Sequence, residues 1–146
     1  MPHVSLKING DGPLIKCHIG VSHPRRDALL AAGQNVPPPV QITALIDTGA
    51  SSSSIDPSIL RQLNLPLKGQ VPIHTPSTDV NSPHIANLYD VSITFSHRLG
   101  TSSVTALEVI ESCLDHQGIQ ALIGRDVLAY CLFTYDGVAQ NFCLAL

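Results

Sequence analysis

Apolar and polar residues alternate along much of the chain, in short runs separated by Gly, Pro, Asn or Asp. Alternation with a period of two is typical of half-buried β-strands, and those four residue types are typical of the turns between strands. The runs that we predict to be strands cover residues 4–8, 14–21, 40–46, 71–75, 85–95 and 104–110, with a further hairpin over 133–144. The first two runs are expected to pair as a hairpin, and so are the fourth and fifth.

Helical signals are few and short. Asp56 followed by Pro57 suits the N-cap and the first position of a helical turn over 56–63. Short helices are expected over 24–32 and over 126–131, and the stretch 22–39 has the character of an insertion between two strands. The pattern therefore predicts an all-β fold with one or two short helices.

The composition fits one domain over residues 1–146, because 44% of the residues are hydrophobic and only 13% are charged. The net charge is −3 and no basic stripe is present, so we expect no nucleic-acid partner. Charged residues and glycines interrupt the apolar runs, so no segment is expected to cross a membrane. The first seven residues lack the basic-then-apolar layout of a secretory signal, which predicts a cytoplasmic location.

The four cysteines, Cys17, Cys113, Cys131 and Cys143, form no C-x-x-C pair, and the seven histidines are scattered. The spacing typical of zinc ligands is missing, so the sequence predicts no metal site and no cofactor. We expect the cysteines to be reduced, mostly buried thiols that behave as small hydrophobic side chains.

The strongest chemical signal is the segment Ala-Leu-Ile-Asp-Thr-Gly-Ala-Ser at residues 44–51. Asp47 follows an apolar strand, and Gly49 stops that strand in a tight turn. An ionised carboxylate beside apolar neighbours is costly unless it is hydrogen-bonded, so Asp47 needs a polar partner. Strand alternation places Leu45 on the same face as Asp47, where it would line a side-chain pocket. Gly49 would let another backbone approach closely.

Two elements occur in this order: Leu45-Ile46-Asp47-Thr48-Gly49-Ala50-Ser51 and, downstream, Leu122-Ile123-Gly124-Arg125-Asp126. Together they resemble the retropepsin-type aspartic proteases, which include the retroviral proteases and their single-lobed cellular and bacterial relatives. The resemblance covers about residues 14–146, with 22–39 unmatched. It implies a single-lobe acid-protease β-barrel whose active site lies at a homodimer interface.

Proteolysis of this kind needs two carboxylates. Like charges placed close together cannot both ionise, so a pair shares one proton and can act as base toward water and as acid toward the substrate. Only Asp47 is followed by Thr-Gly or Ser-Gly in this chain. A symmetric homodimer would bring two copies of Asp47 together at its two-fold axis.

The resemblance also implies roles for the neighbouring residues. Thr48 would hydrogen-bond across the dimer, and Gly49 would offer its carbonyl to an extended peptide substrate. Gly124 and Arg125 would support the active-site loop, and the chain end over 141–146 would form the inter-subunit sheet. Besides Leu45 and Gly49, the expected substrate-binding residues are Ala50, Ser51, Gln120 and Leu122.

The connection between the strands over 71–75 and 85–95 would be the flap that closes over substrate. Its residues are Ser77, Thr78, Asp79 and Val80, and its tip has no glycine, unlike the flaps of viral members. Ser51 stands where viral members often have an aspartate that pairs with the arginine matched by Arg125. Arg125 therefore needs another acceptor.

Other interpretations stay open. Leu45 and Leu122 could be ordinary core residues, and Asp47 could be an ordinary turn residue. The main functional alternative is a protease-like fold that acts as a dimerisation or peptide-binding module with weak or no cleavage. A metal-dependent enzyme that uses the histidines would be inhibited by a chelator. The intact Asp-Thr-Gly favours an active aspartic endopeptidase.

Overall fold

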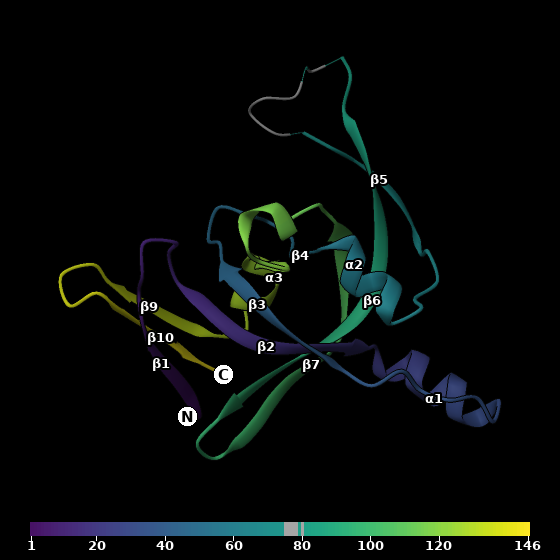
Figure 1. The fold of residues 1–146 in the computed structure, drawn as a ribbon, viewed down its shortest axis with the longest axis horizontal. Coiled ribbons are helices and arrows are strands. Elements are labelled where there is room, and N and C mark those ends of the chain that lie inside the picture. Colours follow the sequence, from purple (N-terminus) through teal and green to yellow (C-terminus); the bar gives the residue numbers. More distant parts are fainter. Residues whose placement is uncertain (75–78, 80) are drawn as a thin grey trace.

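The computed structural model describes residues 1–74, 79 and 81–146. These residues form mainly β-strands joined by short helices, so the prediction of an all-β fold is confirmed (Figure 1). In chain order the elements are β1 (His3–Lys7), β2 (Leu14–Val21), α1 (His23–Ala31), β3 (Val40–Ile46), β4 (Ser54–Ile55), α2 (Pro57–Gln62), β5 (Gly69–Ile73), β6 (His84–His97), β7 (Gly100–Glu111), the 3-10 helix η1 (Asp115–Gln117), β8 (Ala121–Ile123), α3 (Arg125–Leu128), β9 (Leu132–Asp136) and β10 (Asn141–Ala145).

The main sheet has the strand order β2-β3-β8-β4-β7-β6-β5, and an additional pairing of β2 with β6 closes it into a barrel. β3 and β8 run parallel, with Leu45 opposite Leu122 and Ile46 opposite Ile123. Parallel neighbours end at the same edge of a sheet, so the turns after these two strands lie together. This pairing brings the two motifs of the sequence to one place in the fold.

The core of the barrel is filled by β-branched and aromatic side chains that alternate along the strands. Ile19, Ile93, Phe95, Val109 and Ile123 are among the completely buried ones. Burial of each such side chain contributes about 1.5–3 kcal/mol to folding. The predicted hairpin between the runs 71–75 and 85–95 is present, because β5 pairs antiparallel with β6 from Gly69 opposite Leu88 to Ile73 opposite His84.

The expected hairpin between the first two strands is wrong. β1 pairs with β10 at the other end of the chain, and β2 pairs with β3 and β6, while only an isolated bridge joins Asn9 to Gly12. The turn residues at 9–13 reverse the chain, but the apolar faces decide the partners. Val4 lies opposite Leu144 and Leu6 opposite Phe142, so apolar side chains share one face of the sheet.

The two ends of the chain therefore belong to one small sheet with the strand order β1-β10-β9. The hairpin predicted over 133–144 is its β9–β10 pair, with Asp136 opposite Asn141 next to the turn. In Figure 1 the N- and C-termini lie close together beside this sheet, and the β9–β10 hairpin extends to the side opposite α1.

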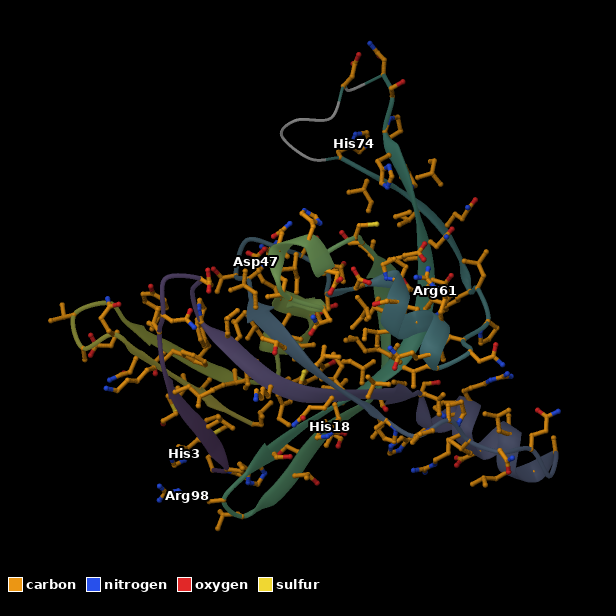
Figure 2. All side chains as sticks on the ribbon, viewed as in Figure 1. His3, His18, Asp47, Arg61, His74 and Arg98 are labelled. Atoms are coloured by element: carbon orange, nitrogen blue, oxygen red, sulfur yellow. The ribbon has the colours of Figure 1, made fainter. Side chains whose placement is uncertain are left out.

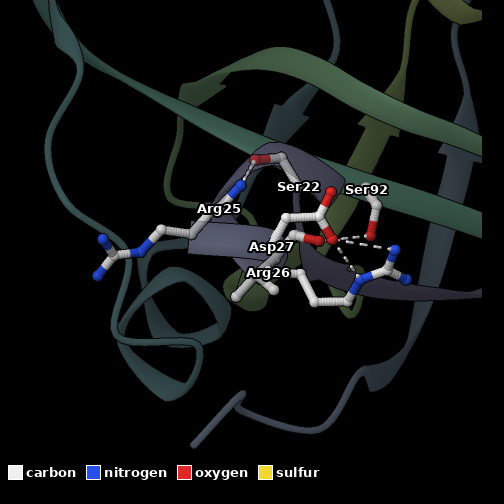
Figure 3. Close-up of polar contacts among 6 residues, drawn as sticks. Ser22, Arg25, Arg26, Asp27 and Ser92 are labelled. Atoms are coloured by element: carbon white, nitrogen blue, oxygen red, sulfur yellow. Dashed lines mark hydrogen bonds and ion pairs between the residues drawn. The ribbon is translucent and has the colours of Figure 1, made fainter. Parts of the chain in front are cut away.

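The stretch 22–39 forms α1 and an extended return to β3. Ser22 caps the helix, because its hydroxyl accepts from the backbone N–H of Arg25 at 3.4 Å, and the exposed Arg26 pairs with Asp27 (Figure 3). Below the cap, the Ser92 hydroxyl donates to the carbonyl of Val21 at 2.9 Å. Only Leu29 of the helix is buried, so α1 projects from the barrel (Figure 1).

Helix α2 begins as predicted, with Asp56 as its N-cap and Pro57 at its first position. The four cysteines are free: Cys17 is buried, Cys113 is exposed, and Cys131 and Cys143 are half-buried. Burial raises the pKa of the Cys17 thiol to about 12, so this side chain is a neutral part of the core. Within the described ranges, no helix has the length and apolar character needed to cross a bilayer.

Candidate active site

Asp47 is the first residue after β3 and is held by backbone groups on two sides. Its N–H donates to the carbonyl of Ile123 at 2.9 Å, which continues the pairing of β3 with β8. Its Oδ1 accepts from the N–H of Gly49 at 2.9 Å, and its carbonyl accepts from the N–H of Ala50 at 3.2 Å. Asp47 is half-exposed at the end of β3 (Figure 2). The polar partner that the sequence analysis expected for its carboxylate is the N–H of Gly49.

Arg125 ties the second motif to this turn. Its guanidinium Nη1 donates to the carbonyl of Thr48 at 3.0 Å and to the carbonyl of Gly49 at 3.1 Å. Its backbone N–H donates to the carbonyl of Ala50 at 2.9 Å. These carbonyls are the acceptors that Arg125 needed, so the arginine supports the loop without a carboxylate at position 51. Ser51 itself is exposed.

A second connection between the motifs involves Ser53 and Asp126, which were not predicted as site residues. Asp126 accepts from the N–H and the hydroxyl of Ser53 at 2.8 and 2.7 Å, and the Ser53 hydroxyl accepts from the N–H of Gly124 at 3.0 Å. Ser53 is completely buried. These partners are more than 70 residues apart in the sequence, so no local pattern predicts the contact. Asp126 follows Gly-Arg in the second motif, but the run of four serines does not indicate which serine is its partner.

Gly124 lies too close to this loop for any side chain. A Cβ at this position would lie 2.7 Å from the carbonyl carbon and 2.9 Å from the carbonyl oxygen of Ser52. The absence of a Cβ therefore allows β8 and the loop after Asp47 to pack directly on each other. Gly49 is also restricted, because its Cβ would lie 3.1 Å from Oδ1 of Asp47.

Leu45 and Leu122 are side by side on the paired strands, and both are half-buried. Leu14 lies opposite Leu45 on the other side of β3. Gln120, which was expected to line the same pocket, uses its Oε1 to accept from the N–H of Thr43 at 3.0 Å. Its side chain therefore extends the pairing of β3 with β8, and this backbone role was not predicted.

The predicted flap lies between β5 and β6, and three of its four residues, Ser77, Thr78 and Val80, lie outside the described residues. Asp79 is exposed, and its carboxylate accepts from the N–H of Asn81 at 3.0 Å. In Figure 2, His74 at the end of β5 lies far above the level of Asp47.

The structure thus gathers Asp47, Thr48, Gly49, Ala50 and Arg125 around one turn, with Gly124 beside it. Thr48 is exposed, so its hydroxyl is accessible to a second molecule. Among the residues described, His, Cys, Asp and Glu side chains form no group of three able to hold a metal ion. The chemistry available at this turn is that of a carboxylate fixed by backbone hydrogen bonds.

Comparison with known proteins places this geometry in a family. A family model described as "Aspartyl protease" matches residues 33–127. Among solved structures, a retropepsin-like aspartic protease from Rickettsia conorii is similar, with a TM-score of 0.60 and 16% identity over 97% of this chain and 89% of that chain. EIAV protease complexed with the inhibitor HBY-793 is similar over 62% of this chain and 76% of that chain, with a TM-score of 0.36 and 19% identity. No curated protein sequence matches.

The family match extends over more than half of the chain and includes both Asp47 and Arg125. The overall likeness of fold extends over nearly all of it. The chain therefore belongs to the aspartyl protease family and has the retropepsin-like, single-lobe fold.

Proposed function

We propose that this protein is a homodimeric aspartic endopeptidase in which Asp47 of each copy supplies one member of the catalytic pair. The observation that carries the proposal is the fixed position of Asp47. Its Oδ1 is held by the N–H of Gly49, and Arg125 fixes the carbonyls of the same turn. These hydrogen bonds fix the orientation of the half-exposed Asp47 carboxylate, so that it can lie next to the Asp47 carboxylate of a second copy.

Two such carboxylates would divide the chemistry between them. The unprotonated one takes a proton from a water molecule as that water attacks the carbonyl carbon of the scissile bond. The protonated one donates a hydrogen bond to the carbonyl oxygen, where negative charge develops. The proton taken from water then passes to the amide nitrogen as the C–N bond breaks.

The surrounding residues would bind the peptide in an extended conformation. Leu45 and Leu122 form the apolar wall of a side-chain pocket, and Gly49, Ala50 and Ser51 line the loop that faces the peptide backbone. Gln120 positions Thr43 in β3 through its side-chain amide, and so acts on this wall indirectly. Thr48 would join the two active-site turns across the dimer axis, and the segment Ser77 to Val80 would cover the bound peptide.

Cleavage of an unstructured protein at pH 4–6, with and without pepstatin, tests the proposal. Asp47→Asn removes the ionisable group and keeps the shape, so we expect cleavage to fall by about 10²–10⁴-fold while the fold persists. Asp27→Asn, on the exposed helix α1, is the matched control and should cleave like the parent. Cleavage by Asp47→Asn at the parental rate would overturn the proposal, and inhibition by a chelator would indicate a metal-dependent enzyme.

The second candidate function is a dimerisation or peptide-binding module with little or no cleavage. It is favoured by the flap sequence, which has no glycine between Thr75 and Asn81. The same experiment separates the two functions. A parent protein that binds an extended peptide without cutting it, and binds equally well after Asp47→Asn, would be such a module.

A further inference from the structure

β1 and β2 begin as a hairpin at the turn over 9–13 and then separate. An isolated bridge joins Asn9 to Gly12, but β1 has β10 as its strand partner, and residues 14–17 of β2 pair with β3. The second neighbour of β2, β6, pairs with it only from His18 onward. Among the described residues, β1 and the first half of β2 therefore each have one edge without a strand partner, and both edges start from the same turn (Figure 1).

The free edge of β1 presents the backbone groups of its odd-numbered residues. The N–H of Ile8 donates to the carbonyl of Gln140, which precedes β10. Hydrogen-bonded and non-bonded pairs alternate along an antiparallel ladder, so the even-numbered residues of β1 bond to β10. The N–H and C=O groups of Ser5 and Lys7 therefore face away from β10, toward the gap between β1 and β2.

The free edge of β2 presents the backbone groups of its even-numbered residues. The N–H of Ile46 donates to the carbonyl of Pro13, so the odd-numbered residues of β2 bond to β3. The N–H and C=O groups of Lys16 therefore face away from β3. A strand inserted between β1 and β2 would find hydrogen-bond donors and acceptors on both of its sides.

Leu6 shows that the gap also exposes apolar surface. It lies opposite Phe142, on the face of the small sheet that packs on the core. Phe142 is 1% exposed, whereas Leu6 is 38% exposed. The difference follows from their places in the sheet, because β10 has a neighbouring strand on both sides and β1 has one on a single side. A side chain placed beside Leu6 would bury further apolar surface, which is favourable.

A groove of about 500 Å³ lies along this gap, a volume typical of ligand-binding clefts. Residues of β1, β2 and β3 line it, and Ser96 of β6 lies at its far end. Its apolar lining comes from Val4, Leu6, Leu14 and Ile15. The groove is therefore bounded by both free edges and includes the exposed side of Leu6.

Basic side chains line the same groove, and none of the described residues that line it is Asp or Glu. The basic residues are Lys7, Lys16 and His18. Within the part of the chain that the structure describes, ion pairs with carboxylates involve Arg26 and Lys68. Both lysines of the groove therefore carry positive charge that no carboxylate of the chain compensates.

The surroundings of the groove strengthen this charge. In Figure 2, His3 and Arg98 lie at the lower end of the molecule, below His18. Asp11 is exposed in the turn where β1 and β2 meet, and it does not line the groove. The protein as a whole has a net charge of −3, so the groove is positive against the overall charge. Such a local field favours an anionic partner.

The two strands also define which side-chain pattern a partner needs. Leu6 and Ile15 belong to the core side of β1 and β2, whereas Lys7 and Lys16, one position further along each strand, belong to the opposite side. Successive side chains of an extended peptide point to opposite faces. An inserted strand that alternates apolar and acidic residues would thus place its apolar side chains beside Leu6 and its carboxylates beside the lysines.

We propose that the groove between β1 and β2 binds an acidic peptide segment in an extended conformation, as a strand inserted between the two free edges. Main-chain hydrogen bonds to Ser5, Lys7 and Lys16 give the peptide its direction, and alternation of acidic and apolar residues gives specificity. The groove uses neither Asp47 nor its turn. The site is therefore a docking site that does not depend on the proposed catalytic pair.

Fluorescence anisotropy at pH 7 tests the site, with a fluorescein-labelled peptide of alternating Glu and Val as the probe. The full-length protein carries Asp47→Asn, so that the probe is not cleaved. We expect Lys16→Glu to raise the Kd of the probe at least about 10-fold, because it places like charges together. Arg61→Glu is the matched control, since Arg61 is exposed on α2, away from the groove (Figure 2), and its Kd should stay within about twofold of the parent. Equal binding by the two variants, or no binding by the parent, would refute the docking site.

Changes in the probe test the mode of binding without altering the protein. A peptide of alternating Gln and Val should bind at least about 10-fold more weakly, because it lacks the carboxylates. N-methylation of the valines removes the N–H groups of one peptide edge and should weaken binding by a similar factor. Unchanged binding after N-methylation would contradict insertion as a strand.

Competition identifies the occupant and separates this site from the active site. Pepstatin should leave the probe bound to the parent protein, and displacement by pepstatin would place the probe at Asp47 and overturn the proposal. Displacement by single-stranded oligothymidylate at lower concentration than by unlabelled peptide would assign the groove to nucleic acid instead. Probe binding that depends on Lys16 in a protein that cleaves no peptide would support the docking site and refute the proposed function.

Discussion

The buried carboxylate of Asp56 makes the stability of the protein depend on pH, and this dependence can be tested. The side chain is 4% exposed and accepts four hydrogen bonds. Two come from the hydroxyl and N–H of Ser58 at 2.6 and 2.9 Å, and two from the N–H groups of Leu114 and Asp115 at 2.8 and 2.9 Å. They join the start of α2 to the segment between β7 and β8. We predict that Asp56→Asn destabilises the protein at neutral pH and much less in strong acid.

The magnitude follows from the pKa of Asp56. Burial alone would raise this pKa, but the hydrogen bonds outweigh burial and lower it from 3.8 to about 2. At about 1.36 kcal/mol per pKa unit, this difference corresponds to about 2 kcal/mol of folding free energy. Because the folded-state pKa is depressed, the stabilisation is complete well above pH 3.8. It is lost as the pH falls toward 2, where the unfolded chain binds the proton first.

Denaturant unfolding at pH 6, 4, 3 and 2.5 measures this effect. We expect Asp56→Asn to be about 2 kcal/mol less stable than the parent at pH 6, with the difference shrinking steadily below pH 4. Asp11→Asn, in an exposed turn, is the control and should change stability by less than about 0.5 kcal/mol. A difference between the parent and Asp56→Asn that stays constant from pH 6 to pH 2.5 would refute the reasoning.

The remaining predictions concern the contacts between the two motifs. Ser53→Ala leaves the N–H of Gly124 without its partner and removes one bond to Asp126. We expect the free energy of unfolding, measured in denaturant, to fall by about 2–3 kcal/mol, whereas the exposed control Ser51→Ala should keep the parental value. Gly124→Ala forces a Cβ against the Ser52 carbonyl and should cost about 3 kcal/mol and most of the cleavage. Gly137→Ala, whose Cβ would meet its nearest atom at 3.6 Å, should be close to neutral, and equal effects of the two would contradict the packing argument. Arg125→Ala removes both bonds to the loop carbonyls, so kcat/KM should fall by about 10- to 100-fold, and an unchanged kcat/KM would show that these contacts do not position Asp47.

Features with a local signature could be predicted from the sequence. Asp47 at the end of an apolar run, Asp56 before Pro57, and the hairpin predicted over 133–144 each depend on residues that are neighbours in the chain. Their geometry is set by strand alternation, helix capping and turn chemistry, which act over a few residues. The retropepsin-like fold could also be predicted, because the resemblance depends on two short motifs at a recognisable spacing in the sequence.

The partners of these local elements were decided by the tertiary structure alone. β1 pairs with β10, Ser53 bonds to Asp126, the side chain of Gln120 bonds to Thr43, and Arg125 donates to the carbonyls of Thr48 and Gly49. Each contact joins residues more than 70 positions apart, and a strand or a polar side chain is compatible with many partners. The choice among them depends on which pairing buries the apolar faces together and satisfies every buried polar group, and no local stretch of sequence contains that information.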